Sequence, residues 1–164
     1  MTNFNEHALE MSIMQLFKEQ GYTYISGDQI HRERTEVLLA DDLKQYLYSR
    51  YAKDGITPSE VESIVLMLRN TSGTLYEANK AIYKMLCDGF IFNREDRTQK
   101  DIFIELIDFE KPENNIFKAV NQFEIVGMNN QMRIPDGIVF VNGIPVVVLE
   151  FKSAIKENTT IMDA

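Results

Sequence analysis

RIPDGIVFVNGIPVVVLEFKS, residues 133–153, is the stretch of sequence that decides the fold. Two β-rich segments, 133–141 and 144–152, flank the pair Asn142-Gly143. An Asn-Gly pair between two such segments is the strongest short sequence signal for a β-hairpin. We therefore expect two antiparallel strands that are joined at this pair.

The second segment changes abruptly from apolar to charged residues. Residues 144–149 are almost entirely apolar, which predicts a strand that is buried on both faces. Glu150 and Lys152 follow, and they share one face because side chains alternate along a strand. Asp136 lies near the start of the preceding strand, which brings it back beside Glu150. Charges at the end of a core strand need partners or a ligand, so these three residues form the candidate site.

The residue types in this trio suit phosphodiester hydrolysis. Carboxylates hold a hard cation such as Mg²⁺ against a phosphate oxygen, and the cation lowers the pKa of a bound water. We therefore expect Asp136 and Glu150 to be metal ligands. A neighbouring amine such as Lys152 can orient the water or stabilise the developing oxyanion. The alternative is a solvated strand end, with Lys152 paired to a carboxylate.

The register of the hairpin tests this site. A two-residue turn with a straight ladder pairs Asp136 with Leu149, so that Asp136 faces away from Glu150. A three-residue loop with a bulge at Gly143 pairs Asp136 with Val148 and places it on the face of Glu150. We predict this bulged hairpin, or an equivalent irregularity at Gly137.

A predicted first helix over residues 5–20 offers a further acid. Its apolar stripe follows the helical spacing and consists of Leu9, Ile13, Leu16 and Phe17. Glu10 borders this stripe and Glu6 lies one turn earlier on the same side. An acid that points to the core side could complete a metal site, and we prefer Glu10 for this role. The alternative is the polar edge of an amphipathic helix.

Predicted helices cluster early in the chain and predicted strands cluster late. The helices are expected at 38–51, from a capping box at Thr57 onward, and at 75–87, and the strands at 101–108, 117–127 and in the hairpin. This order is typical of an α+β fold with a mostly antiparallel sheet. The first helix is expected to pack on that sheet, because its apolar stripe needs a partner.

Composition limits the class of protein and its partners. The chain has 164 residues and one cysteine, Cys87, which fits a cytoplasmic domain with no internal disulfide. Its longest apolar run, 144–149, is too short to cross a bilayer, so no membrane partner is expected. The net charge of −8 predicts weak DNA binding by this chain alone. A bound metal, or basic surfaces on other domains or subunits, would have to offset it.

The same residues resemble a known family. The stretch 133–153, with its Pro-Asp, its Asn-Gly-Ile-Pro and its Glu-x-Lys-Ser, is similar to the nuclease core of the type I restriction enzyme R subunit. That core belongs to the PD-(D/E)XK nuclease superfamily. The first helix, which ends LFKEQGY at residues 16–22, and the helical segment before the strands also resemble this family. The resemblance spans most of the chain and is sharpest over 121–153.

This resemblance implies a fold, an activity and partners. The fold is a restriction-endonuclease-like, mixed or mostly antiparallel sheet flanked by helices, with a helical insert between the first helix and the sheet. The activity is Mg²⁺-dependent cleavage of double-stranded DNA in an ATP-dependent complex with methylation and specificity subunits. Asp136, Glu150 and Lys152 match the catalytic trio, and Glu10 matches the first-helix acid.

The family pattern also indicates where this chain departs from it. A Gln-x-x-x-Tyr motif is expected on a helix after Lys152, and ATP binding belongs to motor domains, but this sequence contains neither. We therefore expect a single nuclease domain over residues 1–164, with a helical part at about 1–90 and a sheet core at about 100–153. We expect it to be truncated at its C-terminal end and inactive alone. Two other functions stay open: a catalytically silent nuclease-like docking module, and a PD-(D/E)XK nuclease of DNA repair.

Overall fold

Two helices begin where the sequence supplies a cap. The computed structural model describes residues 6–127 and 130–151. In it, Thr57 caps α3 (Pro58–Arg69) and Thr74 caps α4 (Leu75–Asp88), each through a complete capping box with the glutamate three residues later. The box satisfies backbone N–H groups that the first turn of a helix leaves unpaired. The predicted capping box at Thr57 is confirmed.

The chain divides into two compact units, which we describe separately. Unit 1 contains Met1–Val37 and Phe117–Ala164, and unit 2 contains Leu38–Ile116. The first helix therefore belongs with the main sheet. The remaining α-helices and a small two-stranded sheet form unit 2.

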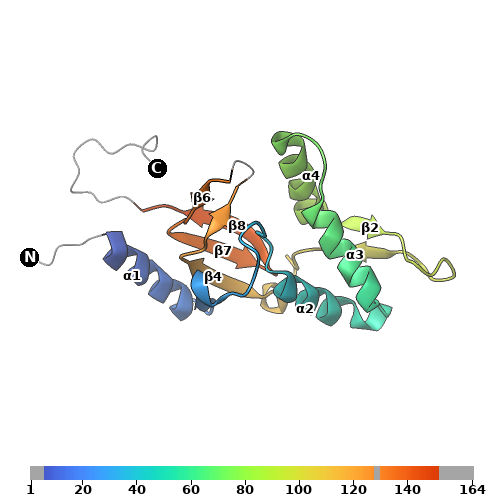
Figure 1. Cartoon of the computed structure of the whole chain (residues 1–164). Helices are drawn as coiled ribbons and strands as arrows, with labels where there is room; N and C mark the ends of the chain where they lie inside the picture. The colour runs from blue at the N-terminus through green and yellow to red at the C-terminus, as the bar shows by residue number, and fades with distance from the viewer. Residues whose placement is uncertain (1–5, 128–129, 152–164) are drawn as a thin grey trace, which may run out of the picture. The chain divides into compact units, whose positions relative to one another are not determined.

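Unit 1 is built on a mixed four-stranded sheet with the strand order β1-β4-β7-β8 (Figure 1). Strand β1 pairs parallel to β4, whereas β4 with β7 and β7 with β8 are antiparallel. A short separate pair, β5 with β6, lies between β4 and β7 in sequence. The elements of this unit are α1 (Glu6–Glu19), β1 (Thr23–Ser26), η1 (Gly27–Gln29), β4 (Phe117–Asn121), β5 (Ile125–Val126), β6 (Met132–Arg133), β7 (Gly137–Val141) and β8 (Ile144–Leu149).

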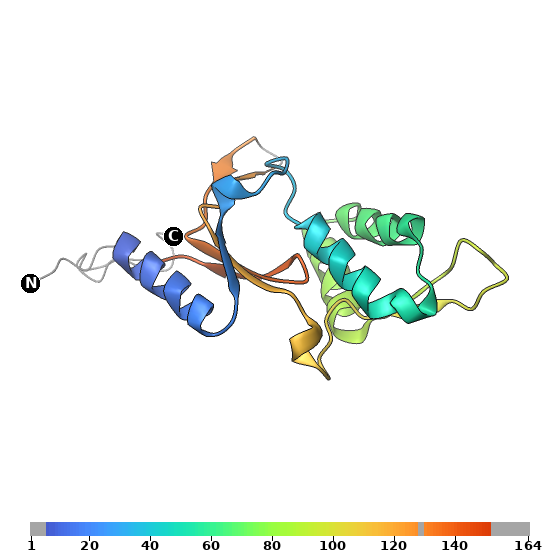
Figure 2. The ribbon, with the colours of Figure 1, turned by 90° about the horizontal axis from the view of Figure 1, so that it is seen from below.

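Helix α1 packs against β1 and β4, as the sequence predicted (Figure 2). Its buried face differs from the predicted stripe, because Met14 is almost fully buried while Leu16 is half exposed. Gly137 makes room for this packing, since a Cβ at that position would lie 2.6 Å from Met14 Cε. The helix ends at Glu19, and Gly21 follows it with a positive φ of 89°, while Tyr22 N donates a hydrogen bond to the Phe17 carbonyl in the last turn.

The hairpin between β7 and β8 corrects one detail of the sequence prediction. The turn has two residues, not three: Asn142 and Gly143 both have positive φ, 50° and 76°, and Val141 pairs with Ile144. These angles match the turn type that Asn-Gly favours. The irregularity lies further along the strands, where the register shifts between Val139 and Phe140.

The shift leaves one residue of β8 without a partner. Phe140 pairs with Pro145 and Val139 pairs with Val147, so Val146 is the extra residue of a β-bulge. Beyond the bulge, Gly137 pairs with Leu149. The predicted irregularity therefore exists, but neither at the turn nor at Gly137. A run of three valines has no polar alternation to fix its register, which explains why the sequence did not locate the bulge.

Strand β8 also differs from the prediction that it is buried on both faces. It lies at the edge of the four-stranded sheet as far as the chain is described. Val146, Val147 and Val148 are all exposed. Their apolar character predicted a core strand, but an edge position decides exposure independently of composition.

Unit 2 has a helical core formed by α2 and α3. Its elements are α2 (Ala40–Tyr51), η2 (Ala52–Asp54), α3, α4, β2 (Phe90–Phe92), β3 (Ile102–Ile104) and η3 (Pro112–Asn114). The fully buried apolar side chains of α2 and α3 include Leu43, Tyr46, Leu47, Val61, Ile64 and Val65. Each such side chain contributes about 1.5–3 kcal/mol by leaving water. These buried positions follow the helical spacing of apolar residues in the sequence.

The other elements of unit 2 depart from the sequence predictions. Helix α4 has the predicted bounds within one residue, yet none of its residues is buried and Leu75 is 74% exposed. The expected strand at 101–108 is reduced to β3, which pairs with β2 instead of joining the main sheet.

The α+β class with a mixed sheet and a helical insert is confirmed. Within the described parts of the chain, no helix combines the length and apolar character needed to cross a membrane.

A buried ion pair fixes the start of α3 to the loop after β2. Glu60 and Arg94 are both almost completely buried, and Arg94 Nη2 lies 2.9 Å from Glu60 Oε2. The hydrogen bond from Arg94 holds the pKa of the Glu60 carboxyl below its usual value, and the same contact raises the pKa of Arg94. Both groups therefore stay charged at neutral pH, and each neutralises the buried charge of the other.

Candidate functional site

Four strand ends meet at one end of the sheet in unit 1. At this end, Ser26 of β1 pairs with Asn121 of β4. Asn121 lies one residue beyond the pair of Val120 and Ile138. Gly137, at the start of β7, pairs with Leu149 at the end of β8. The chain therefore leaves β1, β4 and β8 and enters β7 at the same end of the sheet. We call this region the acidic end, because the predicted acids Glu10, Asp136 and Glu150 belong to segments that reach it.

Asp136 reaches across to the segment that follows β8. Its Oδ2 atom accepts a hydrogen bond of 2.5 Å from the backbone N–H of Phe151. One step beyond the pair Gly137–Leu149, the register sets Asp136 opposite Glu150, and residues paired across strands share a face. Asp136 is half-buried and Glu150 is exposed. Asp136 therefore contacts the backbone of the residue that follows Glu150. A two-residue hairpin without the bulge would pair Asp136 with Leu149 and turn it away from Glu150.

Two predicted candidates fall outside this description. Lys152 lies beyond residue 151, among residues that the structure does not describe. The side chain of Glu6 also lies outside the described part. The choice of Lys152 for the site, and the comparison of Glu6 with Glu10, therefore stay predictions from sequence.

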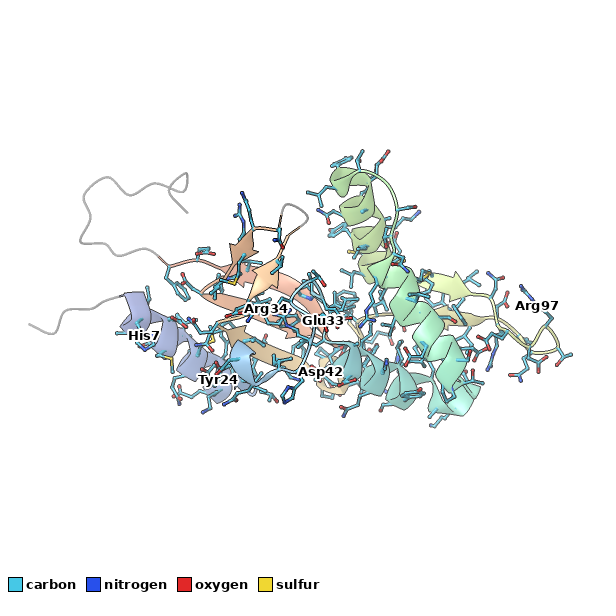
Figure 3. The ribbon with its side chains drawn as sticks, viewed as in Figure 1. His7, Tyr24, Glu33, Arg34, Asp42 and Arg97 are labelled. Carbon is cyan, nitrogen blue, oxygen red and sulfur yellow. The ribbon has the colours of Figure 1, made fainter. Side chains whose placement is uncertain are left out.

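Glu10 lies at the centre of the buried face of α1, one turn before Met14. Its side chain is almost completely buried, and its Oε1 accepts hydrogen bonds from Asn121 Nδ2 at 2.7 Å and Gln122 Nε2 at 3.2 Å. The other oxygen, Oε2, lies 3.6 Å from His7 Nδ1. Figure 3 labels His7 on α1 and Tyr24 on β1, the two elements that flank this carboxylate. Glu10 is therefore buried against the sheet and is not at an exposed edge of the helix.

The three acids do not form a compact cage by themselves. Among residues 6–127 and 130–151, no three His, Cys, Asp or Glu side chains gather closely enough to hold a metal ion alone. A hard oxygen donor set still fits Mg²⁺, because this ion commonly uses one or two carboxylates and completes its shell with waters and substrate phosphates. Asp136 and Glu150 supply such a pair, and Glu10 lies over the end of the neighbouring strand β4.

Sequence reasoning missed the amides that hold Glu10. Asn121 is the last residue of β4 and is only 4% exposed. Its Oδ1 accepts a hydrogen bond of 3.0 Å from Tyr24 Oη. The signal was present in the sequence as two adjacent amides, Asn121-Gln122, at the end of a buried strand. A buried amide such as that of Asn121 needs partners, but a single sequence does not identify those partners.

Comparison with known proteins gives one family. Residues 3–164 match the family model described as "Type I restriction enzyme R protein N terminus (HSDR_N)". The match includes all the segments that build the acidic end.

Two curated relatives cover nearly the whole chain. The type I restriction enzyme HindI endonuclease subunit of Haemophilus influenzae is 32% identical in an alignment 170 residues long that covers 98% of this chain. The putative type I restriction enzyme MjaIXP endonuclease subunit of Methanocaldococcus jannaschii is 33% identical in an alignment 169 residues long that covers 97% of this chain. The chain spans 16% of the length of each of these relatives.

Proposed function

Because the chain belongs to the family of type I restriction enzyme R protein N termini, we propose that its acidic end is a Mg²⁺-dependent endonuclease site. The proposed reaction is hydrolysis of phosphodiester bonds in double-stranded DNA. It takes place within an ATP-dependent restriction-modification complex, with methylation and specificity subunits as partners. ATP is bound by motor domains that these 164 residues do not contain.

The contact between Asp136 and the chain after Glu150 is the observation that supports this proposal most. A carboxylate that accepts a short hydrogen bond from Phe151 N is held in place, next to the position that the register assigns to Glu150. Two carboxylates on one face, at the end of a sheet, are the donor set that a hard divalent cation requires.

The roles of the residues follow from their chemistry. Asp136 and Glu150 would hold the cation, and Glu10 would add a third carboxylate from α1, although among the described residues these three carboxylates do not form a closed group without bound waters or substrate. When bound, Mg²⁺ polarises a phosphoryl oxygen and lowers the pKa of a coordinated water. Lys152 is assigned to orient that water or to stabilise negative charge on the phosphate. The fixed positions of Asp136 and Glu10 reduce the reorganisation that would otherwise be needed when substrate binds.

The acidic composition is compatible with this function only if most of the DNA-binding surface lies outside these residues. Phosphate binding depends on Lys and Arg side chains, whereas this chain has a net charge of −8. We assign most of the DNA-binding surface to the remainder of the subunit or to its partner subunits, and the cutting chemistry to the acidic end.

Replacing Asp136 by alanine is expected to abolish saturable Mn²⁺ binding by the folded chain, because it removes a ligand that no neighbour replaces. The measurement is a titration of the wild-type chain and of Asp136→Ala with Mn²⁺, followed by calorimetry or by the resonance signal of free Mn²⁺. Glu113→Ala is the matched control, since Glu113 is an exposed acid in η3 of unit 2.

Equal binding by the wild-type chain and Asp136→Ala would exclude Asp136 as a ligand. In that case the silent docking module becomes the better account of this fold. The full gene sequence distinguishes a restriction subunit from the alternative, a DNA repair nuclease. A P-loop motor encoded after Ala164 supports the restriction subunit, and its absence would support a different nuclease.

A further inference from the structure

A partly buried chain of hydrogen bonds connects strands β1 and β4 to the Glu10 carboxylate on α1. Tyr24 Oη on β1 donates to Asn121 Oδ1, and Asn121 Nδ2 at the end of β4 donates to Glu10 Oε1 on α1. Asn121 thus uses its oxygen as an acceptor and its nitrogen as a donor, which fixes the orientation of the amide. Because the acceptor is a carboxylate, the second bond is charge-assisted and stronger than a neutral one.

The residue after Asn121 adds a second amide to the same oxygen. Gln122 Nε2 donates to Glu10 Oε1 at 3.2 Å. Gln122 has a positive φ of 51°, a left-handed conformation that costs energy for a residue other than glycine. This bend ends β4. In a regular strand, the side chains of Asn121 and Gln122 would point to opposite faces. Here both of them reach the Glu10 carboxylate.

The surrounding backbone is built to hold this bend. A Cβ on Gly27 would lie 2.5 Å from the carbonyl oxygen of Gln122, so only glycine allows the turn after β1 to approach this closely. The Arg32 guanidinium lies 3.4 Å from the centre of the Phe123 ring and also donates to the carbonyl of Glu124. A strained residue persists only when its neighbours determine it this strongly.

We propose that Asn121 is a positioning residue for Glu10, with Gln122 as a second one, and that their amides hold Oε1 so that Oε2 is presented to the catalytic cation. This rests on the proposed function, in which Glu10 is a metal ligand. A purely structural role predicts something different: the amides would only join α1 to the sheet, and their loss would lower stability without changing metal affinity.

The test is Mn²⁺ affinity, measured on folded protein well below its melting temperature, together with the melting temperature of the metal-free chain. Asn121→Ala is expected to weaken Mn²⁺ binding about 10–100-fold, the range for loss of an outer-shell partner of a metal ligand. Tyr24→Phe keeps the Asn121 amide but removes its orienting partner, and is expected to weaken binding roughly 3-fold.

Tyr22→Phe is the matched control, because it makes the same chemical change two residues earlier, where the ring packs beside Phe17 and Phe117. Its Mn²⁺ affinity should equal that of the wild-type chain. If Asn121→Ala does not fold, the comparison of Tyr24→Phe with Tyr22→Phe decides the question.

The outcomes separate the two proposals. A wild-type chain that binds no Mn²⁺, or that binds it as well as Asp136→Ala, overturns the proposed function and this inference with it. If Asp136→Ala loses binding while Asn121→Ala and Tyr24→Phe bind Mn²⁺ like the wild-type chain, only the positioning role is overturned. Lower melting temperatures with unchanged affinity would then assign Asn121 to stability alone.

Discussion

Replacement of Glu60 by alanine is expected to lower the free energy of unfolding of unit 2 by about 3 kcal/mol, because it leaves Arg94 charged and buried without its partner. Arg94 Nη1 and Nη2 also donate to the carbonyls of Asp54 and Gly55, at 2.7 Å each, so the guanidinium is held in place and cannot simply turn to solvent. The same substitution removes the acceptor of the Thr57 N–H at the start of α3.

Urea unfolding followed by circular dichroism measures this loss. The control is Glu62→Ala in the same helix, because the Glu62 side chain is 59% exposed where it pairs with Lys44. Such surface pairs contribute at most about 1 kcal/mol. Equal destabilisation by the two substitutions would show that the Glu60–Arg94 pair does not hold unit 2 together.

Replacement of Asp136 by asparagine is expected to reduce Mg²⁺-dependent DNA cleavage by more than about 100-fold, beyond the 10–100-fold effect of losing an outer-shell partner. Asparagine has the same size, and its Oδ1 can still accept the hydrogen bond from Phe151 N. The substitution therefore removes the charge that the cation needs while the local backbone keeps its partner.

Cleavage is measured with the complete gene product and its partner subunits, on DNA that carries their recognition site. Glu113→Gln is the control and should cleave at the wild-type rate. Asp136→Asn should keep the wild-type melting temperature, which would exclude misfolding as the cause. A variant that cleaves DNA within a few-fold of the wild-type rate would remove Asp136 from the catalytic residues.

Local features of the fold could be predicted from the sequence because their causes are local. The Thr57 capping box and the position of the hairpin at Asn142-Gly143 each depend on residues within a few positions of one another, and both are present, although the predicted three-residue loop is wrong. The apolar spacing of α2 and α3 also predicted their buried faces. In each case the residues that determine the feature lie within the same short segment of sequence.

Features that depend on distant partners could not be predicted in the same way. The parallel pairing of β1 with β4 joins Tyr24 to Ala119, and nothing in either short segment specifies the other. The bulge at Val146 arises in a run of valines that allows more than one register. Exposure of β8 depends on which strands lie beside it, and not on its own composition.

The candidate site shows the same division. Asp136 and Glu150 were found from the hairpin because one short segment contains both. Glu10 was expected at the border of an apolar stripe, but the structure buries it, because Asn121 and Gln122 arrive from a strand more than 100 residues later in the chain. The roles of Asp136, Glu150, Glu10 and Lys152 in metal binding and catalysis all stay predictions.

The most direct measurement is a crystal structure of the chain grown with Mn²⁺, with anomalous difference density used to locate the ion. We predict one strong peak at the acidic end, within about 2.0–2.4 Å of carboxylate oxygens of both Asp136 and Glu150, a range typical of small divalent cations. A peak bound elsewhere, or no peak at saturating Mn²⁺ with these carboxylates well ordered, would contradict the proposal that this end of the sheet is a metal-dependent nuclease site.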